Sequence, residues 1–368
     1  MTEPHTGKYL SRAIELARDA AGGVSPRPPV GAVIVSKSGK VVGEGQTEPR
    51  PGVHAEVAAI QKAGKDARGA TMYCTLEPHA HQAFAAPCTE EIISAGIERV
   101  VCPLEDPNPV VNGNGFRRLR SAGIEVVTEA AADLKEQVED IISGFAMLTT
   151  TGRPQFTLKY AMSLDGRIAT SEGESQWITG EAARAEAHKM RRSSDALVTG
   201  VGTVLSDNPR LTARDADGSS TGRPRLRVVL DTHGRMRQDA ALLRERGDIL
   251  WVLGEGTRAQ PPLSGVETVH LPVSDGRPDL MALAKLLGER GYCDVMIESG
   301  GKLAGAFAAA GLVDRVAAFV GPLIIGGENA PGPVEGPGSK RLSEAFRLHR
   351  IRVKRLGDDV LLTGRVRR

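Results

Sequence analysis

His54, Glu56, His79 and Cys88 are the residues of the first half whose types could hold and use a metal ion. His and Cys are common zinc ligands, and a catalytic zinc site uses three protein ligands and leaves a fourth position for water. His54 and Glu56 form a His-x-Glu pair at the start of a predicted helix, and each of the other two residues follows a proline. A Glu that stands beside a ligand without binding the metal can shuttle protons. The spacing is compatible with a hydrolytic zinc centre with Glu56 as proton carrier, but a His-x-Glu tripeptide taken alone is more often an ordinary surface pair.

A second set of residues, in the other half, fits nucleotide chemistry. A predicted strand over 295–298 ends in Glu298 and leads through Ser299-Gly300-Gly301 into a helix. Bare backbone amides at a helix N-terminus can hold a phosphate, although a plain strand-to-helix turn fits this sequence about as well. The pair Gly200-x-Gly202 lacks the third glycine and the acidic partner of the dinucleotide fingerprint. We therefore predict no Rossmann domain.

The elements that must position the first set alternate between helix and strand. Apolar spacing predicts helices near 9–20, 55–62, 88–95, 115–122 and 131–145, and strands over 30–35, 41–42, 71–76, 99–103 and 124–127. The first two strands are expected to form a hairpin. Alternating order favours a mostly parallel sheet covered by helices, with the metal ligands at the N-terminal ends of helices.

The second half repeats this α/β order after a break at 149–153, where β-branched, turn and ring residues follow one another. Strands are predicted near 156–160, 196–199, 226–230, 249–253, 295–298, 315–320 and 360–362, and helices near 181–192, 280–290 and 303–310. We place one domain at 1–148, a linker at 149–153 and a second domain at 154–368. Segments 215–224 and 328–340 read as surface loops.

Composition excludes several classes of function. The chain has 368 residues and a formal net charge of +2, and aromatic residues make up 4% of it. Neither a charged field nor stacking platforms are therefore present for nucleic acid or a membrane surface. Four cysteines are too few for a disulfide framework, and no apolar leader or spanning segment is seen. We expect a soluble, cytoplasmic, two-domain protein.

Wider motifs in the first half resemble the deaminase domain of the bifunctional riboflavin-biosynthesis deaminase-reductase family. They are Pro-Val-Gly-Ala-Val-Ile-Val at 29–35, Thr-Leu-Glu-Pro at 75–78, Ile-Ile-Ser-Ala-Gly-Ile at 92–97 and Asp-Pro-Asn-Pro-Val-Val-x-Gly-x-Gly at 106–115. The resemblance covers about residues 7–127 and implies a cytidine-deaminase-like α/β/α sandwich. It also implies zinc held by His54, His79 and Cys88, with Glu56 catalytic.

This chain departs from the family pattern around the metal site. His79 stands where the family usually has Cys, Arg27 where it has Asn, and Thr47 where it has His, while 81–86 lacks the usual Gly-Arg-Thr character. Imidazole remains a competent ligand, since nitrogen binds zinc at about 2.0–2.1 Å and sulfur at about 2.3 Å. The exchange raises the charge of the ligated ion from zero to +1. His81 is the weaker candidate for the same ligand position.

Motifs in the second half resemble the reductase domain of the same family over about residues 154–327. They lie at 157–170, 173–180, 194–196, 200–205, 207–214, 298–305 and 312–314. The resemblance implies a dihydrofolate-reductase-like α/β fold, with the Gly-rich turn after Glu298 at the pyrophosphate of a dinucleotide. The implied cofactor is NADPH.

The resemblance also implies residue roles in this domain. Lys159, Asp207 and Glu298 are expected near the carbon that is reduced, because hydride addition to an imine benefits from proton donation. Contacts to NADPH are expected from Ala161, Trp177, Thr203, Asp207, Gly300, Gly301, Lys302, Leu303, Ala304, Gly305 and Ala306. Substrate contacts are expected from Ser175, Arg191, Leu211, Arg214 and Glu298, the arginines gripping a 5'-phosphate.

The sequence thus predicts deamination of 2,5-diamino-6-(5-phosphoribosylamino)pyrimidinone followed by NADPH reduction of the ribosyl chain to ribityl, in a homo-oligomer acting on a small molecule. One alternative is a reductase whose deaminase half is degenerate and only structural. Another is a non-catalytic nucleotide-binding scaffold. A third keeps both activities but moves the deaminase to another base, for which the departures around His79 are the reason.

Overall fold

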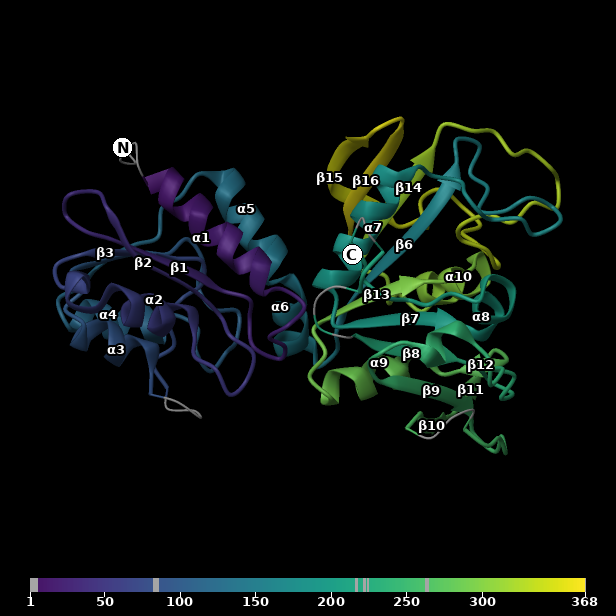
Figure 1. Ribbon diagram of the computed structural model, residues 1–368, viewed down its shortest axis with the longest axis horizontal. Coiled ribbons are helices and arrows are strands. Elements are labelled where there is room, and N and C mark those ends of the chain that lie inside the picture. The colour runs from purple at the N-terminus through teal and green to yellow at the C-terminus, as the bar shows by residue number, and fades with distance from the viewer. Residues whose placement is uncertain are drawn as a thin grey trace. The chain divides into compact units, whose positions relative to one another are not determined.

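The computed structural model describes residues 6–81, 86–215, 218–220, 223, 225–261 and 265–367. The chain divides into two compact units, Met1–Gly152 (unit 1) and Arg153–Arg368 (unit 2). Figure 1 labels the elements of each. No helix within the described ranges combines the length and the apolarity needed to cross a membrane.

Unit 1 is built on a five-stranded sheet in the order β2-β1-β3-β4-β5. The strands are β1 (Gly31–Val35), β2 (Val41–Gln46), β3 (Thr71–Cys74), β4 (Arg99–Val101) and β5 (Glu125–Val127). The predicted hairpin of β1 and β2 is confirmed. Strand β1 also pairs antiparallel with β3, while β3, β4 and β5 run parallel. The sheet is therefore mixed rather than mostly parallel.

Helices cover both faces of this sheet. They are α1 (Thr6–Ala20), α2 (Ala55–Ala63), α3 (Cys88–Ser94), α4 (Asn114–Ser121), α5 (Ala132–Ile141) and α6 (Ser143–Thr151), with a short 3-10 turn at Gly64–Ala67. Figure 1 shows α1 and α5 on one face and α2, α3 and α4 on the other. Helix α2 lies very close to β2, because a Cβ at Gly43 or Gly45 would come within 2.2 Å of a helix carbonyl. This tight packing fixes the start of α2, where His54 lies.

Residues 149–151, expected in a linker, belong to helix α6. Their side-chain hydroxyls donate to carbonyls one turn back, for example Thr150 Oγ1 to Ala146 O at 2.7 Å. Such back-bonding lets β-branched threonines stay helical. The helix ends only at Gly152, whose left-handed backbone suits glycine. The expected helix over 131–145 is likewise two helices that meet at Ile142.

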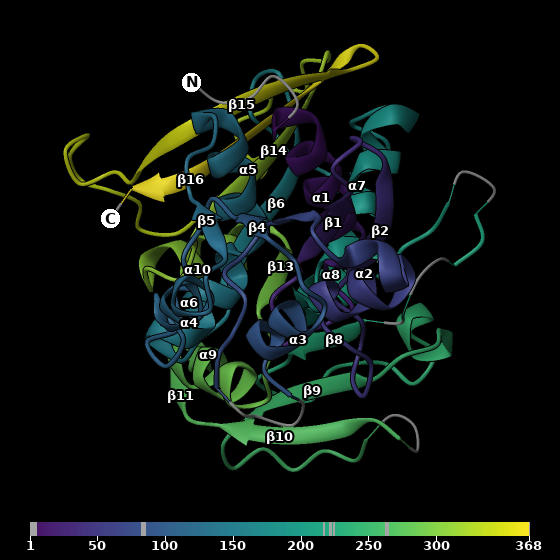
Figure 2. The same cartoon turned by 90° about the vertical axis from the view of Figure 1, so that its left-hand side faces the viewer.

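Unit 2 contains a nine-stranded sheet in the order β10-β9-β8-β7-β13-β6-β14-β16-β15. The strands are β6 (Gln155–Ser163), β7 (Ala196–Gly200), β8 (Leu226–Leu230), β9 (Ile249–Gly254), β10 (Glu267–Leu271), β13 (Asp294–Glu298), β14 (Arg315–Gly321), β15 (Arg347–Leu356) and β16 (Asp359–Arg367). From β10 to β14 along this order, each strand runs parallel to its neighbour. Strand β16 then pairs antiparallel with β14, and β15 pairs antiparallel with β16. A separate hairpin joins β11 (Val273–Ser274) and β12 (Arg277–Pro278). Figure 2 shows β10 and β15 at opposite edges.

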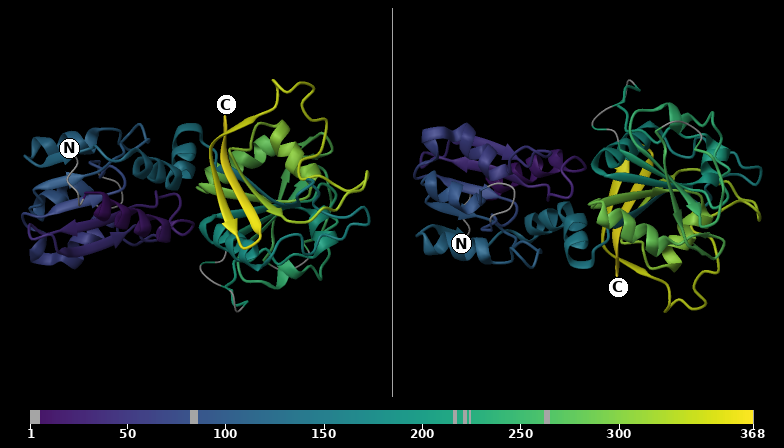
Figure 3. Two further views of the ribbon diagram at one scale, coloured as in Figure 1. Left: turned by 90° about the horizontal axis from the view of Figure 1, so that it is seen from above. Right: turned by 90° about the horizontal axis from the view of Figure 1, so that it is seen from below.

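The helices of unit 2 are α7 (Glu181–Ser193), α8 (Val201–Asp207), α9 (Leu280–Glu289) and α10 (Gly301–Ala309), with a 3-10 turn at Ala241–Arg244. A large apolar cluster joins β6, β7, β8, β9, β13 and β14 to α9 and α10. A smaller cluster joins α7 to β14 and β16. Figure 3 shows the β15–β16 ribbon along one edge of this unit. The sheet is therefore a central layer whose parallel strands end together at one edge.

Candidate functional site

The three predicted metal ligands lie together in unit 1. The ligand atoms of His54, His79 and Cys88 are all within 4.8 Å of one another. The Nδ1 atom of His54 is 3.4 Å from Cys88 Sγ, and the two imidazole rings are 4.7 Å apart at their centroids. Two imidazoles and a thiol that converge in this way suit a zinc ion. His81 lies 5.2 Å from the His79 ring but is not part of this group.

Local structure explains this convergence. His54 is the extended residue before α2, and Cys88 is the first residue of α3. His79 lies in the loop after β3 rather than at a helix start, and its carbonyl accepts the Thr89 N–H at 3.3 Å. Two helix starts and one loop therefore supply the three predicted ligands.

The electrostatics of the cluster favour neutral imidazoles. Burial, followed by the charge of Arg27, lowers the pKa of His54 to about 4. Burial and the neighbouring His54 lower the pKa of His79 to about 4 as well. Neutral imidazole is the form that binds metal ions. Arg27, one of the departures from the family pattern, donates to the Gly52 carbonyl at 2.6 Å and contributes positive charge beside the site.

Glu56 is buried next to this cluster, with a side chain only 4% exposed. Burial raises its pKa to about 7, although hydrogen bonds to its own backbone and to Cys88 partly oppose the rise. The nearby Asp106 raises it further. A carboxyl that titrates near neutral pH can both accept and donate a proton.

Unit 2 contains a cavity of about 1020 Å³ at the carboxyl ends of its parallel strands. Most of the predicted reductase residues line it: Lys159, Ala161, Ser175, Trp177, Arg191, Thr203, Asp207, Leu211, Arg214, Glu298, Gly300, Gly301, Lys302 and Leu303. In open α/β sheets, ligands bind at this edge. The residues come from strand ends, from α7 and α8 and from the start of α10.

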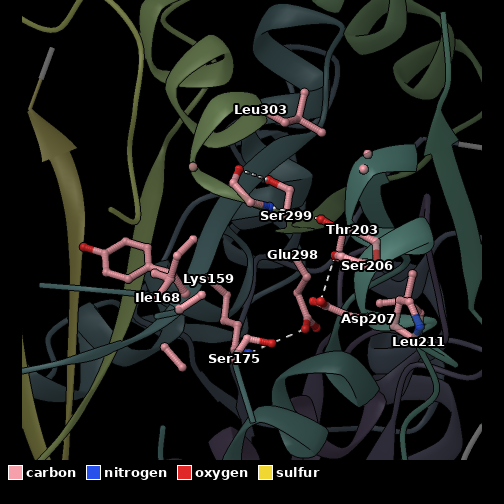
Figure 4. A pocket seen from close by; sticks show the side chains of 18 of the residues that line it. Lys159, Ile168, Ser175, Thr203, Ser206, Asp207, Leu211, Glu298, Ser299 and Leu303 are labelled. Atoms are coloured by element: carbon pink, nitrogen blue, oxygen red, sulfur yellow. Dashed lines mark hydrogen bonds and ion pairs between the residues drawn. The ribbon is translucent and has the colours of Figure 1, made fainter. Parts of the chain in front are cut away.

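The centre of this cavity holds a buried carboxylate between two cations. Arg191 donates from Nε and Nη2 to the two oxygens of Glu298, at 2.6 and 2.7 Å. Lys159 Nζ lies 3.5 Å from Glu298 Oε2, and Figure 4 shows these two side chains pointing toward each other. Burial alone would raise the pKa of Glu298, but the charges of Arg191 and Lys159 outweigh it and lower the pKa to about 2. Glu298 is therefore a permanent anion at neutral pH.

Comparison with known proteins agrees with both sites. Residues 154–362 match the family model of the RibD C-terminal domain, and residues 4–104 match that of the cytidine and deoxycytidylate deaminase zinc-binding region. The riboflavin biosynthesis protein RibD of Bacillus amyloliquefaciens is 38% identical over 97% of this chain and 95% of its own length. The chain belongs to the RibD family.

Other RibD proteins give the same result. That of Escherichia coli is 36% identical over 96% of this chain and 97% of its own length. The crystal structure of a diaminohydroxyphosphoribosylaminopyrimidine deaminase/5-amino-6-(5-phosphoribosylamino)uracil reductase from Thermotoga maritima is 35% identical, with a TM-score of 0.83, over 98% of this chain and 99% of that one. The predicted family, the fold class and the pair of deaminase and reductase activities are confirmed, and the alternatives are not favoured.

Within the RibD fold, Arg191 has a different partner from the one expected. The sequence predicts that it grips a substrate phosphate, but its fork is occupied by Glu298, and its Nη1 donates to the Thr212 carbonyl at 3.2 Å. In this geometry Arg191 orients Glu298. Arg214 lines the same cavity, and its buried Nε has no hydrogen-bond partner within the described residues. Arg214 is thus the better placed of the two to meet an anion.

The Gly-rich turn of this RibD protein is explained partly by packing. A Cβ at Gly305 would lie 1.6 Å from the Glu335 carbonyl oxygen, and one at Gly301 would lie 2.3 Å from that of Gly332. The Gly300 N–H is already donated to Thr203 Oγ1 at 3.2 Å. Of the predicted cofactor contacts on α10, Ala304, Gly305 and Ala306 lie outside the cavity lining. The segment around Glu335 therefore requires Gly305, whichever ligand binds nearby.

Residues near the rim complete the cavity. Asp207, at the end of α8, is exposed and accepts the Ser206 hydroxyl at 2.8 Å (Figure 4). Trp177 is 69% exposed, and the Arg184 guanidinium lies 4.5 Å above its ring. Several lining residues were not predicted: Arg184, Thr232, Arg235 and Arg277. The only signal of the three arginines in the sequence is charge, which surface residues share, and Thr232 carries no such signal.

Proposed function

We propose that residues 1–148 deaminate 2,5-diamino-6-(5-phosphoribosylamino)pyrimidinone and that residues 154–368 reduce the ribosyl chain of the product with NADPH. The observation that carries the deaminase half is the convergence of His54, His79 and Cys88 beside the buried Glu56. The name of the Thermotoga maritima protein supports this order of reactions. His79, where the family usually has cysteine, supplies a nitrogen donor in place of a sulfur donor.

In the first reaction His54, His79 and Cys88 would hold a zinc ion. A zinc ion in such a site acts as a Lewis acid and lowers the pKa of water. Glu56 is placed to accept a proton from the attacking water and to return it to the amino nitrogen, which leaves the ring carbon as ammonia while the oxygen of the water takes its place. Its burial excludes bulk solvent, and its pKa of about 7 makes both transfers accessible at neutral pH.

In the second reaction Lys159, Asp207 and Glu298 surround the carbon that is reduced. The start of α10 and Thr203 would hold NADPH, which would supply the hydride. Glu298 stays ionised and holds the Lys159 ammonium in place at 3.5 Å. Lys159 is then the donor that can protonate the substrate atom which gains electrons. Arg214 faces the substrate phosphate.

One preparation of the purified protein tests both halves. We expect zinc near one ion per chain, ammonia release from the diaminopyrimidine phosphate, and NADPH oxidation that depends on that release. Zinc-loaded protein that oxidises NADPH with the deaminated substrate but releases no ammonia would support the reductase-only alternative. A panel of aminopyrimidines tests the alternative in which the deaminase acts on another base. In that case one of the other aminopyrimidines would release ammonia faster than the diaminopyrimidine phosphate does.

A further inference from the structure

Glu77 has a buried carboxylate that neither proposed reaction uses. Its side chain is 3% exposed, and no ion pair reaches it within the described residues. Four backbone N–H groups donate to it instead. Asp106 and Gly113 donate to Oε2 at 3.0 and 2.9 Å, and Gly115 and Phe116 donate to Oε1 at 2.8 and 3.2 Å. A carboxylate that accepts four amide protons is satisfied without a cation.

All four donors belong to one segment, 106–116, which comprises a loop and the first turn of α4. The residue before α4 is Gly113, which has no side chain to cap the helix. The first N–H groups of a helix lack partners within it and favour an anion. Glu77 supplies that anion from a distant part of the chain, so it ties the segment to its own position.

The same segment also touches the residue before the metal ligand His79. A Cβ at Gly115 would lie 1.9 Å from the Pro78 carbonyl oxygen, so only glycine permits this approach. In addition, the Glu77 N–H donates to the Leu104 carbonyl at 3.0 Å. The turn 77–79 and the chain 104–116 are thus joined by backbone packing and by the Glu77 carboxylate together.

The other end of the segment reaches the catalytic carboxyl. Asp106, held through its N–H by Glu77, is close enough for its charge to act on Glu56. Its carbonyl accepts Asn112 Nδ2 at 3.0 Å, and its Oδ1 accepts the Asn108 N–H at 2.8 Å. The start of the segment is therefore bonded to its own loop as well as to Glu77. Its position beside Glu56 depends on what holds it to the turn 77–79.

We propose that Glu77 is a positioning residue of the deamination: it holds segment 106–116 against the His79 turn and so fixes the wall beside Glu56 that the pyrimidine meets. The inference rests on the proposed deaminase function. Glu77 touches neither substrate nor metal, so its effect reaches the reaction through the segment. Loss of its charge should therefore weaken substrate binding more than turnover.

The test uses the full chain with Glu77→Gln, in which an amide NH2 must face two backbone N–H donors. Glu98→Gln, at an exposed Glu paired with Lys37, is the matched control. We expect the KM for deamination to rise roughly tenfold or more, kcat to change less, and amide exchange in 106–116 to accelerate. Zinc content and NADPH oxidation on supplied deaminated substrate should stay as in the parent protein.

Unchanged KM and unchanged exchange would overturn the inference, as would loss of zinc and kcat with KM preserved. If Glu77→Gln fails to fold, Gly115→Ala tests the same contact between segment 106–116 and the turn 77–79 by a change in the segment. It should raise KM and exchange in the same way, and no change in either would again overturn the proposal. If the parent protein itself releases no ammonia, the proposed function fails, while the exchange comparison still decides whether Glu77 holds the segment.

Discussion

Each unit of this RibD protein places a buried glutamate at its site, and the two glutamates have opposite properties. Glu56 in unit 1 is 4% exposed and has a pKa raised to about 7. Glu298 in unit 2 is 9% exposed and has a pKa lowered to about 2. Burial raises the pKa of both carboxyls, so burial cannot be the cause of the difference. The difference comes from the groups that surround each carboxyl.

The neighbours of Glu56 are a thiol and another carboxyl, whereas Glu298 lies between Arg191 and Lys159. A carboxyl without a permanent cation can exchange protons near neutral pH. A carboxylate between two cations cannot, but it can hold those cations in place. The surroundings of the same residue type therefore suit proton transfer in one unit and the orientation of cations in the other.

The largest expected effect follows from removing the proton carrier. Glu56→Gln keeps the size of the side chain but cannot accept a proton, so ammonia release should fall by roughly 10²–10⁴-fold. NADPH oxidation on supplied deaminated substrate should be unchanged, because unit 2 does not use Glu56. Parallel assays of both activities on one preparation measure this. A variant that keeps a tenth or more of its ammonia release would show that Glu56 is not the carrier.

The next effect comes from taking the main cation away from Glu298. Arg191→Met leaves a buried carboxylate with only Lys159 nearby, and breaking a buried pair of this kind costs about 3–5 kcal/mol of stability. Urea unfolding of the full chain, followed by a probe in unit 2, measures the loss. The double variant Arg191→Met/Glu298→Gln should recover part of it, since no buried carboxylate is left without Arg191; the recovery is partial because Lys159 loses its carboxylate partner. If the double variant is no more stable than the single one, the coupling between the two residues is not the cause.

The sequence predicts much of the molecule, because most strands of both units are short apolar runs bounded by turn residues. The three residues that converge in unit 1 are also singled out by the sequence, since His-x-Glu and the two proline-preceded residues His79 and Cys88 are local motifs. Strand β15 is not predicted. It is an exposed edge strand rich in Arg and Lys, and edge strands with one solvent face and many charges lack the apolar alternation that marks a strand.

Side-chain partners are harder to predict than elements. Arg191 and Glu298 are separated by more than a hundred positions, and only the order of strands β7, β13 and β6 brings them together. The sequence predicts Gly305 as a cofactor-binding glycine. In the structure it packs against the backbone of Glu335, a contact that no local sequence pattern reveals. Glu77 likewise reads as part of a motif, and its four donors follow only from the fold.

A smaller effect is expected from the ligand that departs from the family pattern. Glu298 has a permanent cation, whereas the cation near Glu56 would be the metal itself, held partly by His79. His79→Ala should weaken zinc binding by more than the roughly 10–100-fold that loss of an outer partner costs. Competition with a chelator measures this without reference to activity. His81→Ala is the control, and equal losses in both variants would make His81 a ligand too.

The last effect is the acid response of unit 2, which depends on the sign of the Glu298 shift. The folded pKa of this carboxyl is about 2, below its ordinary value of 4.5, so the unfolded chain binds a proton that the folded one does not. The stabilisation is fully present above pH 4.5 and is lost as the pH falls toward 2. Between these limits Glu298 alone should lower the free energy of unfolding by up to about 1.4 kcal/mol per pH unit.

Denaturant unfolding of unit 2 at several pH values tests this slope. Glu298→Gln should flatten it, and the slope rather than the absolute stability is compared, because the variant also leaves Arg191 without its partner. Asp165 also has a pKa lowered to about 2, by hydrogen bonds from Ser163 and from two backbone amides, so it contributes to the acid response in the same direction, and Glu298→Gln leaves that contribution in place. Equal slopes in the parent protein and the variant would mean that Glu298 titrates normally. Only the raised pKa of Glu56 would then distinguish the two glutamates.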